Sequence, residues 1–160
     1  MRYVMNQKFF SLGDDFTIKD DGGQDCYYVD GKVFSVGDKL AIQDMQGREL
    51  ARVEQKVLSF GKVYHVYRGD QRVATVKKKL FTFFREVFDV EDAAAGDLDA
   101  TGDFIDHEYQ FTRDGQPIAT VSKRFFSLTD TYGVDIASGE DDVLILACAV
   151  VIDLCCHNDR

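Results

Sequence analysis

Up to about residue 136, the chain consists of short runs in which apolar and polar positions alternate, rich in β-branched and aromatic residues. Gly and Asp interrupt these runs at Asp21-Gly22-Gly23, Gln46-Gly47, Gly69-Asp70 and Asp114-Gly115. These residue types tolerate the positive φ angles that tight hairpins need. The pattern therefore predicts about twelve strands joined as an antiparallel meander.

Three of these runs resemble one another, because the segments 47–56, 69–79 and 115–124 each begin with a turn glycine and continue with Ala-x-Val. The charged side chains between these residues, such as Arg52 and Glu54, require water. Alternation then turns the small and β-branched residues inward. The predicted inward residues are Ala51, Val53, Ala74, Val76, Ala119 and Val121. Small inward residues leave space for another element, and the same parity turns Lys78 and Lys123 inward.

A single helix is predicted near residues 138–156. Ser138 and the acids of Glu140-Asp141-Asp142 provide an N-cap and a first turn suited to the helix dipole. The run Val143–Ile152 that follows has no polar side chain. A helix that is apolar on all faces is surrounded by protein, and ten residues span only about 15 Å, half of a bilayer core. We therefore expect a mainly β (α+β) fold, with an antiparallel β domain closed around this buried helix.

Length and composition narrow the classes of partner. The 160 residues fit one domain, spanning 1–160. The net charge of −9 and a pI near 4.7 argue against nucleic acid, whose phosphates require basic surfaces. The N-terminus lacks a signal-like apolar stretch. We expect a cytoplasmic protein without a transmembrane segment, whose cysteines (Cys26, Cys148, Cys155 and Cys156) are reduced thiols.

No residue pattern indicates catalysis or a cofactor. The segment Asp97–Asp103, with Glu108 in twelfth place, approaches the calcium loop of an EF-hand, but neither flank reads as a helix, which favours an acidic β-loop. His65, His107 and His157 are scattered and lack metal-ligand spacing. We expect no catalytic residue, no metal site and no cofactor.

Several segments resemble the LURP-one-related family. They are Gln7-Lys8-Phe9-Phe10-Ser11-Leu12, Tyr28-Val29-Asp30-Gly31, the Ala-Thr-Val-Lys strands, Thr129–Ile136, Gly139–Asp142 and the apolar run ending at Asp153. The resemblance places the chain with tubby C-terminal domains and phospholipid scramblases. It implies a twelve-stranded closed β-barrel threaded by a hydrophobic C-terminal helix. Residues 130–135 look like a remnant of the acidic calcium segment of scramblases, with fewer acids.

The wider group is associated with membranes, so the resemblance implies a non-enzymatic module that recognises phospholipid headgroups or a peripheral membrane surface. Its candidate residues are the outward basic residues Lys77, Lys79, Arg85 and Arg124. The net charge of −9 opposes this reading. The alternatives are a scaffold that binds a protein partner and, least favoured, an enzyme.

Asp153 directly follows the apolar run, at a helix end where the dipole disfavours a carboxylate. It therefore calls for a compensating partner. The inward rows supply Lys78 and Lys123 as candidates, and such a pair would fix the depth and rotation of the helix. The alternative is that Asp153 is solvated and both lysines extend to water.

Overall fold

The computed structural model describes residues 1–6, 15–31, 39–56, 62–82, 85–92, 94–124 and 131–157. Within them the chain forms twelve strands followed by one helix, α1, Asp142–His157. The strands are β1 Arg2–Asn6, β2 Phe16–Asp20, β3 Asp25–Asp30, β4 Lys39–Gln43, β5 Glu49–Gln55, β6 Val63–Arg68, β7 Gln71–Thr82, β8 Arg85–Asp92, β9 Leu98–Asp103, β10 Glu108–Arg113, β11 Gln116–Ser122 and β12 Thr131–Ile136. The family segment at residues 7–12 lies outside the described residues.

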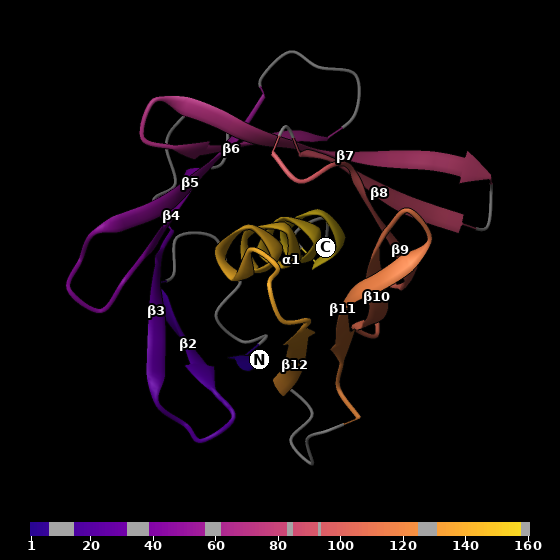
Figure 1. The fold of residues 1–160 in the computed structure, drawn as a ribbon. Helices are drawn as coiled ribbons and strands as arrows, with labels where there is room; N and C mark the ends of the chain where they lie inside the picture. Colours follow the sequence, from indigo (N-terminus) through magenta and orange to yellow (C-terminus); the bar gives the residue numbers. More distant parts are fainter. Residues whose placement is uncertain are drawn as a thin grey trace.

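The strands form a closed antiparallel barrel in which each strand pairs with its neighbour in sequence. β1 completes the ring, since Val4 pairs with Lys19 of β2 on one side and with Gly133 of β12 on the other. The N-terminal amine strengthens this closure by donating a hydrogen bond to the carbonyl oxygen of Ile136 at 2.7 Å. Figure 1 shows α1 inside the ring of strands. The fold predicted from the sequence is confirmed.

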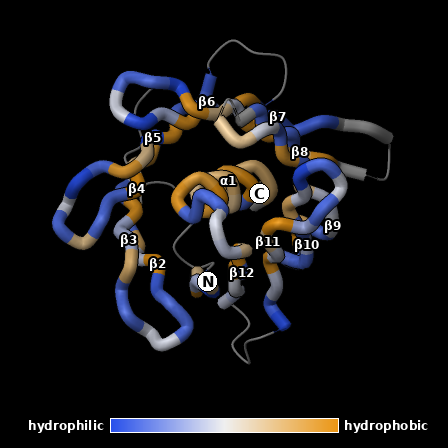
Figure 2. Tube along the Cα trace, in the orientation of Figure 1, coloured by the Kyte–Doolittle hydropathy of each residue, from blue (hydrophilic) through white to orange (hydrophobic). Residues whose placement is uncertain are grey.

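The inner wall of the barrel follows the predicted alternation. All six inward residues of the Ala-x-Val strands are buried: Ala51, Val53, Ala74, Val76, Ala119 and Val121. Figure 2 shows hydrophobic positions along the strands that surround α1 and hydrophilic ones concentrated in the turns. The four cysteines are free thiols, as predicted, with Cys148 and Cys155 buried.

The central helix begins later than the predicted residue 138. Gly139 has a φ of +86°, which is incompatible with a right-handed helix, so the residues before Asp141 form a turn. Asp141 is the N-cap, because its backbone carbonyl accepts from Ile145 N at 3.0 Å and its side chain accepts from Leu144 N at 3.2 Å. From Leu144 to Asp153 every residue is buried, so the enclosed helix is confirmed.

Successive connections of an antiparallel barrel alternate between its two ends. The β4–β5 and β10–β11 turns share one end with the turn that leads into α1, which we call the entry end. The β7–β8 and β9–β10 connections and the C-terminus of α1 lie at the other end, the exit end. The two ends hold the helix by different chemistry.

Candidate functional site

The outward lysines of β7 lie beside acids of β8. Lys77 Nζ is 2.8 Å from Glu91 Oε1, and Lys79 forms an ion pair with Asp89, whose hydrogen bond raises the pKa of this lysine. In the strand register, Lys77 is opposite Asp89 and Lys79 is opposite Val87. Both lysines therefore lean two residues back along β8, away from the β7–β8 connection. These side chains are neutralised locally by their partners.

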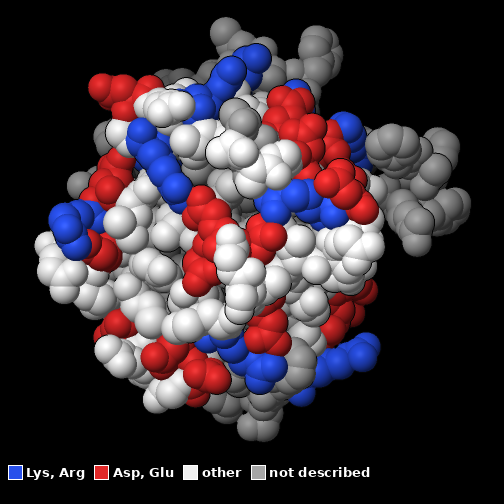
Figure 3. Space-filling model, viewed as in Figure 1, with Lys and Arg blue, Asp and Glu red and all other residues white. Residues whose placement is uncertain are grey.

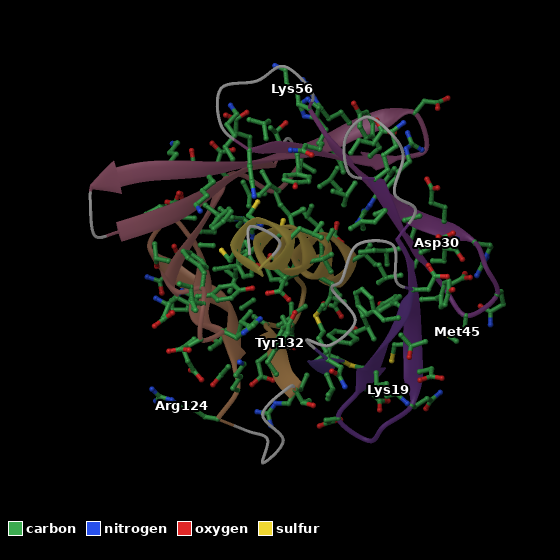
Figure 4. The ribbon with its side chains drawn as sticks, turned by 180° about the vertical axis from the view of Figure 1, so that it is seen from behind. Lys19, Asp30, Met45, Lys56, Arg124 and Tyr132 are labelled. Carbon is green, nitrogen blue, oxygen red and sulfur yellow. The ribbon has the colours of Figure 1, made fainter. Side chains whose placement is uncertain are left out.

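The other two predicted basic residues occupy different positions. Arg85 begins β8, and its side chain lies outside the described residues. Arg124 follows β11 and is 83% exposed, with Nε 3.6 Å from Glu108 Oε2 (Figure 4). β9 and β10 separate β8 from β11 in the barrel. The structure thus brings Lys77, Lys79 and Arg85 together on one hairpin and does not bring Arg124 to it.

An acidic pair lies next to the lysines on the outer face of the barrel. Asp89 and Asp99 are opposite each other on β8 and β9. A hydrogen bond with Asp89, together with partial burial, raises the pKa of Asp99.

The segment considered as an EF-hand loop forms β9, a turn and the start of β10, and neither of its described flanks is a helix. Glu108 accepts hydrogen bonds from Ser122 Oγ and Lys123 N, and no potential metal cluster of His, Cys, Asp and Glu occurs in the described residues.

A second polar group lies inside the barrel, near the exit end. The side chain of Asp153 is fully buried on α1, and Tyr132 of β12 donates a hydrogen bond to its Oδ2. His107, in the β9–β10 turn, places Nε2 2.8 Å from Asp153 Oδ1. The rings of His107 and Tyr132 stack with their centroids 4.3 Å apart. We call Asp153, His107, Tyr132 and Tyr109 the inner polar cluster.

The inner polar cluster gives Asp153 partners that the sequence did not suggest. An imidazole and a phenol contact the carboxylate, while a pair with Lys78 or Lys123 stays a prediction. Lys78 is half-buried opposite Phe88, and Lys123 follows the end of β11 with its backbone N bonded to Glu108. Alternation along a strand predicts which of its residues face inward. It does not predict which strand lies beside Asp153 at the C-terminal end of α1.

Sequence reasoning missed His107 and Tyr132. His107 lies in a turn with a φ of +54°, where side chains do not alternate between inward and outward as they do in a strand. Its burial could therefore not be predicted from the sequence. Tyr132 had a usable signal, since it shares strand parity with the apolar Val134 and Ile136. Figure 4 shows Tyr132 between β12 and the helix.

Burial keeps the phenols of the inner polar cluster protonated. Burial and the neighbouring Asp153 carboxylate raise the pKa of Tyr132 and of Tyr109 well above its ordinary value. Tyr132 therefore remains a hydrogen-bond donor to Asp153. The Tyr109 hydroxyl is also buried, and it makes no hydrogen bond to any described residue. With Asp153, His107 and Tyr132 all at or near zero exposure, the cluster holds the helix in place and offers no access to a substrate.

At the entry end, three consecutive acids attach the start of α1 to three different strands. The contacts are Arg113 Nη1 to Glu140 Oε2 (2.6 Å), Arg68 Nη2 to Asp141 Oδ1 (2.6 Å) and Tyr3 Oη to Asp142 Oδ2 (2.5 Å). Burial, followed by the hydrogen bond with Asp142, raises the pKa of Tyr3. Figure 3 shows acidic and basic side chains side by side near the middle of this face. These acids serve as attachments for the helix.

Residues 1–153 match the LURP-one-related family. The chain belongs to this family. It is 36% identical over 157 residues to a Bacillus subtilis (strain 168) protein described as "Uncharacterized protein YxjI", covering 98% of this chain and 94% of the relative. A solved X-ray structure of an Arabidopsis thaliana protein has the same fold, with a TM-score of 0.70, 17% identity and coverage of 99% of this chain and 92% of that one.

In this LURP-one-related chain, the C-terminal family segments meet in the inner polar cluster, where Tyr132 contacts Asp153. The described acid of the segment 130–135 is already bound within the protein. Asp130 lies outside the described residues, while Asp135 forms two 2.8 Å hydrogen bonds with Arg2, which lower its pKa. In the described part of the chain, no helix combines the length and hydropathy required to cross a membrane.

Proposed function

We propose that this LURP-one-related protein is a non-enzymatic binding module that attaches to anionic membrane surfaces through the β7–β8 hairpin. The observation that carries the proposal is the placement of Lys77, Lys79 and Arg85 together on that hairpin. Each basic residue near an anionic bilayer contributes about 1 kcal/mol of attraction. Two or three such residues on one element are enough for weak, reversible attachment.

The existing ion pairs of the hairpin lysines do not prevent this role. Lys77 and Glu91 are 39% and 55% exposed, and exposed pairs contribute about 0–1 kcal/mol. Exchanging a carboxylate for a lipid phosphate therefore costs little. The net charge of −9 repels an anionic surface at long range, but the acids that hold the start of α1 lie at the entry end, opposite the β7–β8 connection. Salt shortens that repulsion to about 8–10 Å.

We propose a module without catalytic activity because a substrate has no access to the inner polar cluster. The inner polar cluster contains a carboxylate, an imidazole and two phenols, which are groups that can transfer protons. Its members are enclosed between the barrel wall and α1. A substrate would have to displace the helix to reach them.

The proposal is tested by sedimentation with phosphatidylcholine vesicles that contain phosphatidylserine, at low salt. We expect the wild-type chain to bind, and the double variant Lys77→Gln/Lys79→Gln to bind about 25-fold more weakly, since each lysine contributes about fivefold. The matched control is Lys19→Gln/Lys39→Gln, which removes two lysines that are also ion-paired, at 3.2 and 3.9 Å, on other strands. Lys19 lies on the other side of the molecule from the hairpin (Figure 4).

No sedimentation of the wild-type chain at low salt would refute the proposal. Equal losses in the hairpin and control variants would refute the assignment to the hairpin. Arg124→Gln tests whether the fourth predicted basic residue contributes to binding. Because Arg124 lies away from the hairpin, this change should weaken binding by less than the loss of either hairpin lysine.

A further inference from the structure

The outer wall of the barrel over β5, β6 and β7 carries a half-buried histidine. His65 alternates along β6 with the buried residues Tyr64 and Val66, so its side chain faces outward. Its Nδ1 is 3.1 Å from the hydroxyl oxygen of Thr75, which lies opposite on β7 and is itself buried. This contact orients the ring. Nε2, on the other side of the imidazole, makes no hydrogen bond to a described residue.

Three cations on the neighbouring strands act on this imidazole. Arg72 and Lys77 belong to β7, and Lys56 directly follows β5 (Figure 4). Burial, followed by repulsion from these three side chains, lowers the pKa of His65. Glu54, opposite His65 on β5, acts in the other direction. His65 is therefore a neutral imidazole near pH 7 in positively charged surroundings.

The charged groups near His65 differ in whether an opposite charge already binds them. Lys77 Nζ is 2.8 Å from Glu91, and Glu54 accepts a hydrogen bond from Arg52 Nε at 3.1 Å. Arg72 is exposed and forms neither a hydrogen bond nor an ion pair with any residue that the structure describes. A guanidinium without a counterion is notable on a chain whose net charge is −9. It marks this part of the wall as a place for an anion.

The donors and acceptors near His65 fit a phosphate group. A guanidinium binds two phosphate oxygens with its planar fork. Nε2 of His65 donates or accepts a hydrogen bond, depending on the tautomer that the contact with Thr75 selects. A phosphate monoester has a second pKa of about 6, so near pH 7 it offers charged oxygens and, in part of its population, a hydroxyl donor. Phosphate therefore satisfies either tautomer, whereas sulfate and carboxylate can only accept.

We propose that Arg72, Lys56 and Nε2 of His65 bind a phosphate monoester group on the outer wall of the barrel. The group belongs to a soluble ester or to a lipid headgroup, which share this chemistry. The inference goes beyond the proposed attachment, because it concerns the wall over β5, β6 and β7 and does not require the end of the β7–β8 hairpin.

Inorganic phosphate is the probe, and the readout is proton NMR of the histidine Cε1 signals at constant ionic strength. His65→Gln identifies the signal of His65 among the three histidines. We expect phosphate to raise the pKa of His65 in a saturable manner, because a bound anion offsets the neighbouring cations. Arg72→Gln should weaken phosphate affinity about tenfold. Arg72→Lys keeps the charge but not the planar fork, so it should weaken affinity less.

Arg48→Gln is the matched control. It removes a guanidinium that is 79% exposed in the β4–β5 turn, and it should leave phosphate affinity unchanged. Sulfate should bind more weakly than phosphate. A His65 signal that shows no saturable response to phosphate, or equal affinities in Arg72→Gln and Arg48→Gln, would overturn the site. Equal affinity for sulfate would overturn the assignment to phosphate.

Sedimentation with phosphatidylcholine vesicles that contain phosphatidic acid identifies the source of the phosphate. Weaker sedimentation of Arg72→Gln than of Arg48→Gln would support a lipid headgroup, and equal sedimentation would support a soluble ester. Arg72→Gln keeps both hairpin lysines, so with phosphatidylserine vesicles it should sediment like the wild-type chain. The attachment through the hairpin can therefore fail while the phosphate site stands, and the reverse.

Discussion

Replacing Asp153 is expected to remove much of the stability of the barrel. In Asp153→Ala, the hydroxyl of Tyr132 and the imidazole of His107 lose the carboxylate that both contact inside the protein. A buried polar group left without its partner costs about 1–3 kcal/mol, and the removed carboxyl group also leaves a small cavity. We therefore expect a decrease of about 3–5 kcal/mol in the free energy of unfolding, a large part of the 5–15 kcal/mol typical of a domain.

The assay is urea unfolding followed by circular dichroism at neutral pH. Asp153→Asn keeps the size and one acceptor oxygen for Tyr132, so we expect a smaller loss of about 1–3 kcal/mol. Asp97→Asn is the control, because it makes the same chemical change at an exposed position and should stay within about 0.5 kcal/mol. The slope of free energy against urea should be unchanged, since the surface exposed on unfolding is the same.

A double-mutant cycle isolates the contact itself. Tyr132→Phe removes only the hydroxyl, and combining it with Asp153→Asn should give a coupling energy of about 0.5–3 kcal/mol. A loss below about 1 kcal/mol for Asp153→Ala, together with zero coupling, would refute the role of the inner polar cluster in holding α1.

Three further changes test the fold and its electrostatics. Leu146→Asp should prevent folding, because a carboxylate on the enclosed face cannot reach water; soluble protein with an unchanged melting temperature would contradict this. Gly102→Ala should cost over about 2 kcal/mol in urea unfolding, since its Cβ would lie 2.5 Å from a backbone oxygen at φ +141°, whereas Gly23→Ala has open space and should cost about 1–2 kcal/mol. Asp135→Asn removes the ion pair with Arg2, so it should lower stability by under about 1 kcal/mol at pH 7. Because the pKa of Asp135 is lowered in the folded state, its contribution is complete above the unfolded pKa of about 4, and the difference from Asp135→Asn should disappear as the pH falls through the lower folded value.

The sequence by itself determined the secondary structure and the direction of the side chains. Alternation in the Ala-x-Val strands identified which residues face inward, because a period of two places successive side chains on opposite faces of a strand. The apolar run of α1 required complete enclosure, because no face of the helix is suited to water. Lys77 and Lys79 of the β7–β8 hairpin were also recognisable as outward from parity, although their acidic partners were not.

Only the tertiary structure decided how the helix sits inside the barrel. A helix that is apolar on all faces has no hydrophobic side to fix its rotation, so the sequence could not determine which strand Asp153 meets. The closed ring brings the β9–β10 turn and β12 to that point, and the positive φ of His107 directs its imidazole inward. Parity could supply Lys78 and Lys123 only as inward residues, because the period of a strand gives a face and not a position around a barrel. That position follows from packing of the whole ring around the helix.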